Sequence, residues 1–366
     1  MEDGGRKYLS KKGRAILISA LFILVFSGVG LYYLVFSPNW QWLSFWDSSS
    51  SPTSTEVPLK EEAVIENDDD CVDCPISWLN GLPVANEKEA SAFPVAVVID
   101  NDVLARPQNA LSLASLVYEA PVEGGMTRYL AIFPANIDVS AVGPVRSARP
   151  YFVAWAEELR ALFIHCGGSP EALDLLKSAN LYDLNEFYNG NYFWRETSAV
   201  RMAPHNVLTS GDNWRSYLSQ RGLDEKKADS WLFKKEIKPE KTPEPKDISL
   251  RFSANFQAWW RYLPESNSYQ RYFNGVESRD LAGLIQAKNV IIQKVESRIL
   301  DVAGRLALDL EGEGRAEICL DGICRSGFWR HRPGERTRYY YDDGAEIQLN
   351  PGITWIEVAD SNTHLE

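Results

Sequence analysis

The order of apolar and polar positions divides the chain into regions of different character. An uncharged apolar run covers residues 15–36 and follows a basic segment at residues 1–14. A helix of about 20 apolar residues is enough to cross the hydrocarbon core of a bilayer. Because positive charge precedes the run and acidic residues follow it, the N-terminus is expected in the cytoplasm. The pattern predicts a single-pass signal-anchor helix in the cell membrane, with the rest of the chain extracytoplasmic.

A cleaved signal peptide is the alternative for this segment, because it shares the basic start and the apolar core. The apolar run is longer than the core of an ordinary signal peptide, and Ser37-Pro38 offers no small-residue cleavage site. A lipid-modified cysteine directly after the run is excluded, because the first cysteine is Cys71. We therefore favour the uncleaved anchor.

Residues 37–90 lack a regular apolar pattern. They hold runs of serine and aspartate, with prolines at positions 52 and 58. Such a composition cannot bury enough apolar surface to offset the entropy that a chain loses on folding. The sequence predicts a disordered acidic Ser/Pro stalk between the membrane and the folded part of the chain.

Residues 91–232 show the alternation of a mixed α/β domain. β-Branched apolar runs at 94–100, 129–133 and 162–165 predict buried strands. Apolar residues recur with helical spacing at 151–162, which predicts an amphipathic helix. We expect a first domain in which strands and helices are interleaved.

Residues 247–366 differ in kind, because short β-rich runs are separated there by Gly-containing turns. This pattern predicts a mostly antiparallel β-rich second domain. Three prolines among alternating charges mark residues 233–246 as the linker between the domains. The aromatic residues between Trp259 and Phe273 are more typical of sheet packing than of a surface that stacks sugars or bases.

A β-hairpin is predicted around Asp321-Gly322, a dipeptide that favours a two-residue turn. This turn places Cys319 opposite Cys324 on adjacent strands. In an exported domain such a pair is expected to form a disulfide.

The remaining cysteines carry weaker signals. Cys71 and Cys74 have the spacing of half a zinc site or of a redox dithiol, but the second pair of zinc ligands is missing. A short disulfide between them is the preferred interpretation. Cys166 stands alone, and a lone thiol is most often a small buried apolar side chain.

Composition narrows the classes of partner. The chain of 366 residues has a formal net charge of −12. Since nucleic-acid binding requires a basic face, we expect no nucleic-acid partner. The sequence has no phosphate-binding glycine loop and no paired-histidine zinc motif, and we predict neither a cofactor nor a metal.

Several ordered motifs resemble the YerB-like putative lipoprotein family of bacteria. They are Val95-Ala-Val-Val-Ile-Asp-Asn101, Ala105-Arg-Pro-Gln108, Val117-Tyr-Glu-Ala120, Val122-Glu-Gly-Gly125 with Thr127-Arg128, Gly143-Pro-Val-Arg-Ser-Ala-Arg-Pro-Tyr-Phe152, His165-Cys-Gly-Gly-Ser169 and Ala203-Pro-His-Asn206. The resemblance covers residue 90 to the end and implies an exported, membrane-tethered protein with a separate C-terminal β domain and no assigned biochemical role. This chain departs from the family pattern by an apolar helix in place of a lipidated cysteine.

The polar residues of these motifs are the candidates for a shared pocket. Those suited to ligand binding are Arg106, Arg128, Arg146, Arg149, Ser169 and Asn206, and those suited to acid–base chemistry are Glu123, His165 and His205. Ser169 precedes a predicted helix whose free amides can hold an anion, unless Ser169 itself caps them. Likewise, the arginines either form a ligand cradle or pair with Asp100, Glu119 and Glu123 to fix loops.

Two functional hypotheses follow. The first is a non-catalytic envelope module that binds an anionic envelope component or a partner protein through the first domain. The second is a hydrolase or transferase that acts on envelope glycan or on a phosphate-containing polymer, with His165 or Glu123 as base and His205 as acid. The sequence contains no recognisable nucleophile motif, which favours the binding module and leaves enzymatic activity open.

Overall fold

The computed structural model describes residues 73–197, 201–223, 229–236 and 247–365. The predicted cytoplasmic tail, the predicted anchor at 15–36 and most of the predicted stalk lie outside these residues. Within the described part of the chain, no helix has both the length and the apolar character needed to cross a bilayer.

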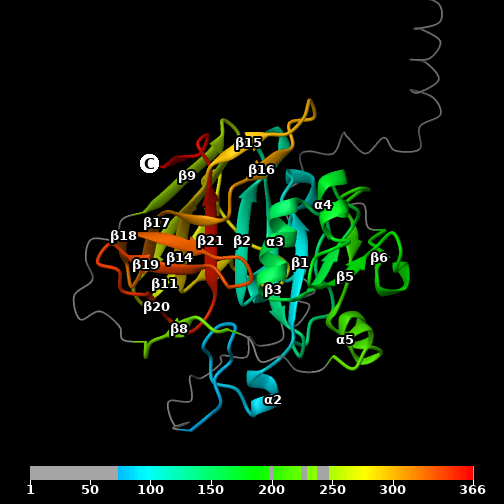
Figure 1. Ribbon diagram of the computed structural model, residues 1–366, viewed down its shortest axis with the longest axis horizontal. Helices are drawn as coiled ribbons and strands as arrows, with labels where there is room; N and C mark the ends of the chain where they lie inside the picture. The colour runs from blue at the N-terminus through cyan, green and yellow to red at the C-terminus, as the bar shows by residue number, and fades with distance from the viewer. Residues whose placement is uncertain (1–72, 198–200, 224–228, 237–246, 366) are drawn as a thin grey trace, which may run out of the picture. The chain divides into compact units, whose positions relative to one another are not determined.

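The centre of the fold is a ten-stranded sheet in the order β19-β18-β17-β14-β21-β2-β3-β1-β4-β5. Its strands are β19 (Arg338–Tyr341), β18 (Ile323–His331), β17 (Gly312–Leu320), β14 (Asn289–Lys294), β21 (Thr354–Ala359), β2 (Leu116–Pro121), β3 (Thr127–Pro134), β1 (Pro94–Asp100), β4 (Leu162–His165) and β5 (Tyr182–Asn185). Five of these strands come from each of the two predicted domains, so one continuous sheet joins both (Figure 1).

Strand β21 connects the strands of the first domain to those of the second. It runs parallel to β2 on one side and parallel to β14 on the other, with Thr354 opposite both Leu116 and Asn289. All six residues of β21 are buried, as expected for a central parallel strand that is covered on both faces. The second domain is therefore mostly antiparallel, as predicted, but its last long strand pairs in parallel with the first domain.

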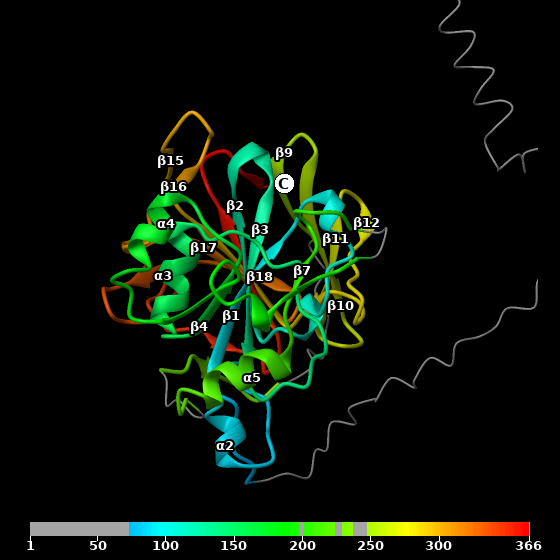
Figure 2. The same cartoon turned by 90° about the vertical axis from the view of Figure 1, so that its right-hand side faces the viewer.

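The two faces of the large sheet are covered differently. Helices α3 (Pro150–Glu158) and α4 (Pro170–Leu175) lie on one face. The other face carries α5 (Gly211–Ser219) and a second sheet, in which β12-β11-β10-β9-β22 follow one another and β13 pairs with β11 (Figure 2). Its strands are β9 (Ile248–Ser253), β10 (Phe256–Leu263), β11 (Ser268–Phe273), β12 (Val276–Glu277), β13 (Gln286–Ala287) and β22 (His364–Leu365).

Short elements complete the structure. They are α2 (Glu87–Ala90), β6 (Trp194–Arg195), β7 (Val207–Leu208), β8 (Leu232–Phe233), β15 (Ser297–Ile299), β16 (Leu306–Leu308), β20 (Gln348–Leu349) and the 3-10 turns η1 (Val103–Ala105), η2 (Leu111–Leu113), η3 (Glu123–Gly125) and η4 (Gly190–Tyr192).

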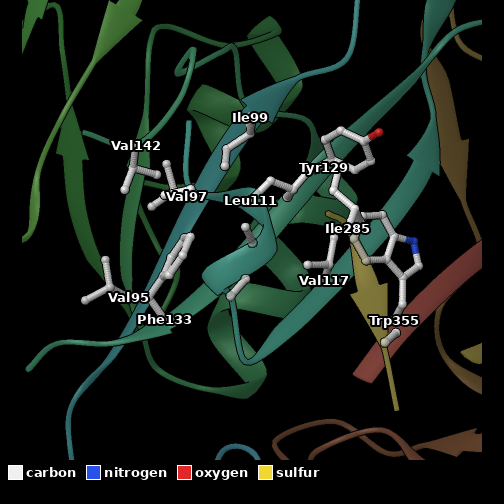
Figure 3. Packing of buried hydrophobic residues seen from close by; sticks show 14 of the residues in the cluster. Val95, Val97, Ile99, Leu111, Val117, Tyr129, Phe133, Val142, Ile285 and Trp355 are labelled. Carbon is white, nitrogen blue, oxygen red and sulfur yellow. The ribbon is translucent and has the colours of Figure 1, made fainter. Parts of the chain in front are cut away.

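Strand β1 contributes side chains to both apolar cores. Because successive side chains of a strand point to opposite faces, Val95, Val97 and Ile99 join the cluster on the side of the second sheet. Ala96 and Val98 join the cluster under α3. Figure 3 shows the first of these clusters. The uninterrupted apolar run of β1 thus reflects burial on both faces.

Two predicted boundaries need correction. Residues 73–90, which the composition predicts as stalk, are folded: Trp78 is buried and its Nε1 donates to the carbonyl oxygen of Ala92 at 3.0 Å. Trp78 and Leu79 supply the buried apolar side chains that hold this segment against the first domain. The predicted linker is also partly packed, because Phe233 lies in β8, which pairs with β20, and Glu236 forms an ion pair with Lys288 at 2.7 Å. Residues 237–246 of that linker lie outside the described chain.

The predicted Cys319–Cys324 disulfide is confirmed. The two residues face each other in the β17–β18 hairpin, with Cα atoms 4.0 Å apart and an S–S distance of 2.01 Å. Asp321 and Gly322 both have positive φ, as a two-residue hairpin turn requires. Cys74 is also in a disulfide, whereas its predicted partner Cys71 lies outside the described residues.

A buried ion pair ties the second sheet to the first domain. Nη2 of Arg271 in β11 donates to both carboxylate oxygens of Glu119 in β2, at 2.8 and 2.7 Å. The two side chains are 1% and 0% exposed. Asn101 and Thr127 donate to the same carboxylate at 3.2 and 2.6 Å. The Glu119 carboxylate and Nη2 of Arg271 are thus paired, as a buried charge requires, whereas Nε of Arg271 has no hydrogen-bond partner among the described residues.

The ion pair predicts a large loss of stability in a Glu119→Gln variant. The substitution keeps the size of the side chain but leaves the buried Arg271 guanidinium without a counter-charge. We expect the free energy of unfolding to fall by about 3–5 kcal/mol, as is typical when one partner of a buried pair is removed. Urea denaturation measures this loss. Glu313→Gln, which breaks the exposed pair with Arg330 at 3.1 Å, is the control and should cost under about 1 kcal/mol. Equal effects of the two substitutions would contradict this role.

The hairpin turn generates a second prediction. A Cβ atom at Gly322 would lie 2.6 Å from the Tyr262 ring, and its φ is +78°. At Gly344 φ is +85° but no atom lies within 4 Å of the added Cβ. Both Gly→Ala variants should lose about 1 kcal/mol from backbone strain, and Gly322→Ala should lose about 1–3 kcal/mol more from the clash. Urea denaturation measures both losses. If Gly322→Ala loses no more stability than Gly344→Ala, the Tyr262 ring moves aside without cost and the predicted clash is wrong.

Candidate functional site

Candidate residues gather at the edge of the large sheet where its parallel strands end. Strands β1, β4 and β5 are parallel neighbours, and their last residues are Asp100, His165 and Asn185. Loops that follow the carboxyl ends of parallel strands meet at one edge, which is the usual place for ligands in such sheets. An antiparallel bridge between Ile99 and Val145 brings the Gly143–Phe152 motif beside β1 at this edge.

Asp100 holds two of the predicted residues. Its Oδ2 lies 3.0 Å from Nε of Arg146 and 2.8 Å from Nδ1 of His205. The Asp100 side chain is only 5% exposed, whereas those of Arg146 and His205 are 24% and 13% exposed. Among the described residues, Nε2 of His205 has no hydrogen-bond partner. A buried carboxylate thus orients a guanidinium and an imidazole toward the surface.

A second arginine extends this arrangement. Nη1 of Arg195 donates to Oδ1 of Asn206 at 3.2 Å, and its Nη2 lies 3.3 Å from Oε1 of Glu186. The thiol of Cys166 donates to the other oxygen of Glu186 at 3.4 Å. We call Asp100, Arg146, Cys166, Glu186, Arg195, His205 and Asn206 the edge cluster.

The thiol in the edge cluster is not an activated nucleophile. Burial, followed by the charge of Glu186 and the hydrogen bond to it, raises the pKa of Cys166 to about 11. The nearby charges of Arg195 and Arg146 oppose this shift without cancelling it. Since the thiolate is the reactive form, Cys166 is almost entirely unreactive at neutral pH.

Glu123, Arg149 and Arg128 form a separate group. Nε of Arg149 donates to Oε2 of Glu123 at 3.1 Å, and its Nη2 pairs with the other oxygen. Burial by itself would raise the pKa of the Glu123 carboxyl, but the hydrogen bond and charge of Arg149 lower it below its ordinary value. Glu123 is therefore a paired carboxylate and a poor proton acceptor. Arg128 donates to the carbonyl of Ser147 at 2.9 Å.

Arg128 stays charged although it is buried. Burial, and then repulsion by Arg149, lower the pKa of Arg128 to about 10. The opposite charges of Asp100 and Glu123 act against that shift. Because Asp100 and Arg128 are also register partners in β1 and β3, Arg128 links the edge cluster to the Glu123–Arg149 pair.

His165 and Ser169 have structural contacts instead. The His165 ring is 0% exposed, with Nδ1 2.7 Å from the carbonyl oxygen of Gly167 and Nε2 2.8 Å from Oδ1 of Asp183. Ser169 accepts the backbone N–H of Ala172 at 3.2 Å and so caps α4. This is the capping alternative that the sequence left open.

Arg106 lies on the side of the second sheet. Its Nη2 donates to Oδ1 of Asn101 at 2.6 Å, and its guanidinium lies 3.3 Å from the centre of the Phe273 ring. Arg106 thus belongs to the buried network around Glu119, not to the edge cluster.

The predicted pocket residues therefore do not form a single site. Arg146, His205 and Asn206 meet in the edge cluster, while Arg128, Arg149 and Glu123 adjoin it. Sequence reasoning missed Arg195 and Glu186, which lie outside the quoted motifs. It treated Asp100 only as a pairing partner, although a carboxylate at the end of a buried strand is a usable signal.

In the described residues, neither a metal centre nor the hollow of the second domain coincides with the edge cluster. The described residues contain no group of three or more His, Cys, Asp and Glu side chains placed to hold a metal ion. A hollow of about 650 Å³ lies in the second domain, between Lys294, Trp329 and Asp360. None of the residues singled out from the sequence lines it.

Comparison with known proteins agrees with this architecture. The "Protein of unknown function (DUF3048) N-terminal domain" matches residues 79–224, and the corresponding C-terminal domain matches residues 248–356. The chain thus has two domains, the second of them strand-rich, although one sheet runs through both. The whole edge cluster lies in the N-terminal domain.

A curated relative and a solved structure extend the match. The chain is 32% identical over 286 residues to "Putative lipoprotein YerB" of Bacillus subtilis (strain 168), which covers 76% of this chain and 85% of that protein. The crystal structure of YerB from Bacillus subtilis matches with a TM-score of 0.71 and 30% identity, over 80% of this chain and 99% of that one. The resemblance seen in the sequence is confirmed, and the chain belongs to the YerB-like DUF3048 family, whose function is unknown.

Proposed function

We propose that this chain is a membrane-tethered, extracytoplasmic protein of the bacterial cell envelope that binds an anionic envelope component or partner through the edge cluster. The relative's name, a putative lipoprotein, supports the location, as does the apolar run at 15–36. The Cys319–Cys324 disulfide suits an oxidising compartment outside the cytoplasm.

The observation that carries the binding proposal is the unequal exposure of opposite charges. The guanidinium-bearing side chains of Arg146 and Arg195 are 24% and 44% exposed, whereas the carboxylates that orient them, Asp100 and Glu186, are 5% and 17% exposed. The outer surface of the cluster is therefore cationic. Planar guanidinium groups held in fixed orientations suit the recognition of carboxylate or phosphate oxygens.

A hydrolase or transferase is the second candidate, supported by the Asp100–His205 pair. A carboxylate on Nδ1 of a histidine, with Nε2 left open, is the orientation of a general base. The surrounding contacts weigh against catalysis, since Cys166 is protonated and Glu123 is tied to Arg149. We therefore rank binding first.

The binding proposal predicts that the two exposed arginines are required for attachment to envelope material. Arg146→Gln and Arg195→Gln should each weaken co-sedimentation of the chain with isolated bacterial cell walls by about 10-fold or more, since each removes charge-assisted hydrogen bonds. Arg315→Gln is the control, because Arg315 is an exposed arginine of the second domain, paired with Asp342 at 2.8 Å. If all three variants sediment like the unmodified chain, the edge cluster is not the binding surface.

Substitution of His205 separates the two candidates. His205→Gln removes the open Nε2 but leaves the exposed arginines, so binding to cell walls should change less than about threefold, the effect of one neutral hydrogen bond. Incubation of the unmodified chain with cell walls should release no soluble sugar or phosphate. Release of either by the unmodified chain, lost in His205→Gln, would establish the enzymatic candidate in place of the binding module.

A further inference from the structure

A smaller hollow lies where the second sheet meets the first domain. Its volume is about 250 Å³. Arg106, Gln108 and Tyr129 of the first domain line it together with Arg271, Phe273 and Ser278 of the second. It is separate from the edge cluster, because none of that cluster's residues contributes to its lining.

Two hydrogen-bond donors at this hollow have no protein partner in the described chain. Nη2 of Arg106 is engaged by Asn101, but its Nη1 forms no hydrogen bond. The Tyr129 hydroxyl likewise forms none, although the residue is only 1% exposed, and it points away from the neighbouring core side chains (Figure 3). Burial raises the pKa of Tyr129, so its hydroxyl stays protonated and able to donate. Neither donor is sealed off, because the fully enclosed unpaired atoms of the described residues include Nε of Arg106 but not these two. A ligand or a water molecule in the hollow can therefore accept from both.

The charged side chains that line the hollow, together with Glu119, the ion-pair partner of Arg271, sum to one positive charge. Arg106 and Arg271 contribute two positive charges, and Glu119 neutralises that of Arg271. Glu357 lies opposite Glu119 on β21 but does not line the hollow, and burial and then the charge of Glu119 raise its pKa well above the ordinary range. Glu277 and Arg279, also on the lining, pair with each other at 3.4 Å.

We propose that this hollow is a binding site for a carboxylate group, held by Arg106 Nη1 and the Tyr129 hydroxyl at the junction of the two domains. A carboxylate carries the single negative charge that balances the excess, whereas a phosphate monoester carries about two at neutral pH. Its two oxygens match the two open donors. The carboxylate belongs either to a peptide terminus or to an acidic sugar.

The test is the thermal unfolding of the full-length chain in detergent micelles at constant ionic strength. A ligand that binds only the folded state raises the unfolding midpoint in proportion to its saturation. Sodium acetate is the first probe, with acetamide as the neutral probe of the same shape and inorganic phosphate as the competing anion. We expect acetate to raise the midpoint, and acetamide and phosphate to have no effect at equal concentration. N-acetylalanine and glucuronate then distinguish a peptide from a sugar, because the true source should stabilise more than acetate does.

Two variants and one control locate the site. Tyr129→Phe removes only the open hydroxyl and should weaken acetate binding by about 3–10-fold, while Arg106→Gln should weaken it by about 10–100-fold. Arg261→Gln should leave it unchanged, because Arg261 lies over Trp259 on the same sheet but does not line the hollow. The edge-cluster variant Arg195→Gln should also leave acetate binding unchanged. Failure of this site and failure of the proposed function can therefore be told apart.

Three results would overturn the proposal. Acetate that fails to stabilise the unmodified chain excludes the site. Equal stabilisation by acetamide or by phosphate shows that the hollow does not select a carboxylate. An undiminished acetate effect in a folded Tyr129→Phe variant places the binding elsewhere on the molecule.

Discussion

The ion pair between Glu119 and Arg271 is the constraint on which the arrangement of the two domains depends. It joins a strand of the large sheet to a strand of the second sheet, and both side chains are almost completely buried. A buried charge without its partner is strongly destabilising, so displacement of either strand would lower the stability of the fold. The parallel pairing of β21 with β2 acts in the same place, and together they make one body of two family domains.

Two polar residues at the end of β1, Asp100 and Asn101, make contacts on opposite sides of the large sheet. Asp100 turns toward Arg146 and His205, while the next residue, Asn101, bonds to Glu119 and Arg106. Neighbouring residues of an extended chain face opposite ways, which is why one strand end supports both the edge cluster and the junction hollow. The proposed surface for an anionic partner and the proposed carboxylate site are thus adjacent along the chain but built on different faces.

Much of the local structure could be predicted from pattern alone. The strands at 94–100 and 162–165, the capped helix after Ser169 and the Cys319–Cys324 hairpin depend on nearby residues, and each appears as expected. The stalk boundary failed because average composition hides a few well-placed apolar residues. Trp78 and Leu79 are buried, and Asn80 bonds to Ser115, so these few residues tie the segment to the first domain.

By itself, the sequence determined the family, several of the strands and helices, the hairpin disulfide and the residue types suited to anion recognition, because these depend on local periodicity and short motifs. Only the tertiary structure decided which arginine meets which carboxylate. Arg146 and His205 converge on Asp100, whereas Arg106 turns to the Phe273 ring, and Arg271, absent from the predicted site, pairs with Glu119. Such contacts join residues distant in sequence, and they arise from strand pairing that no single segment encodes.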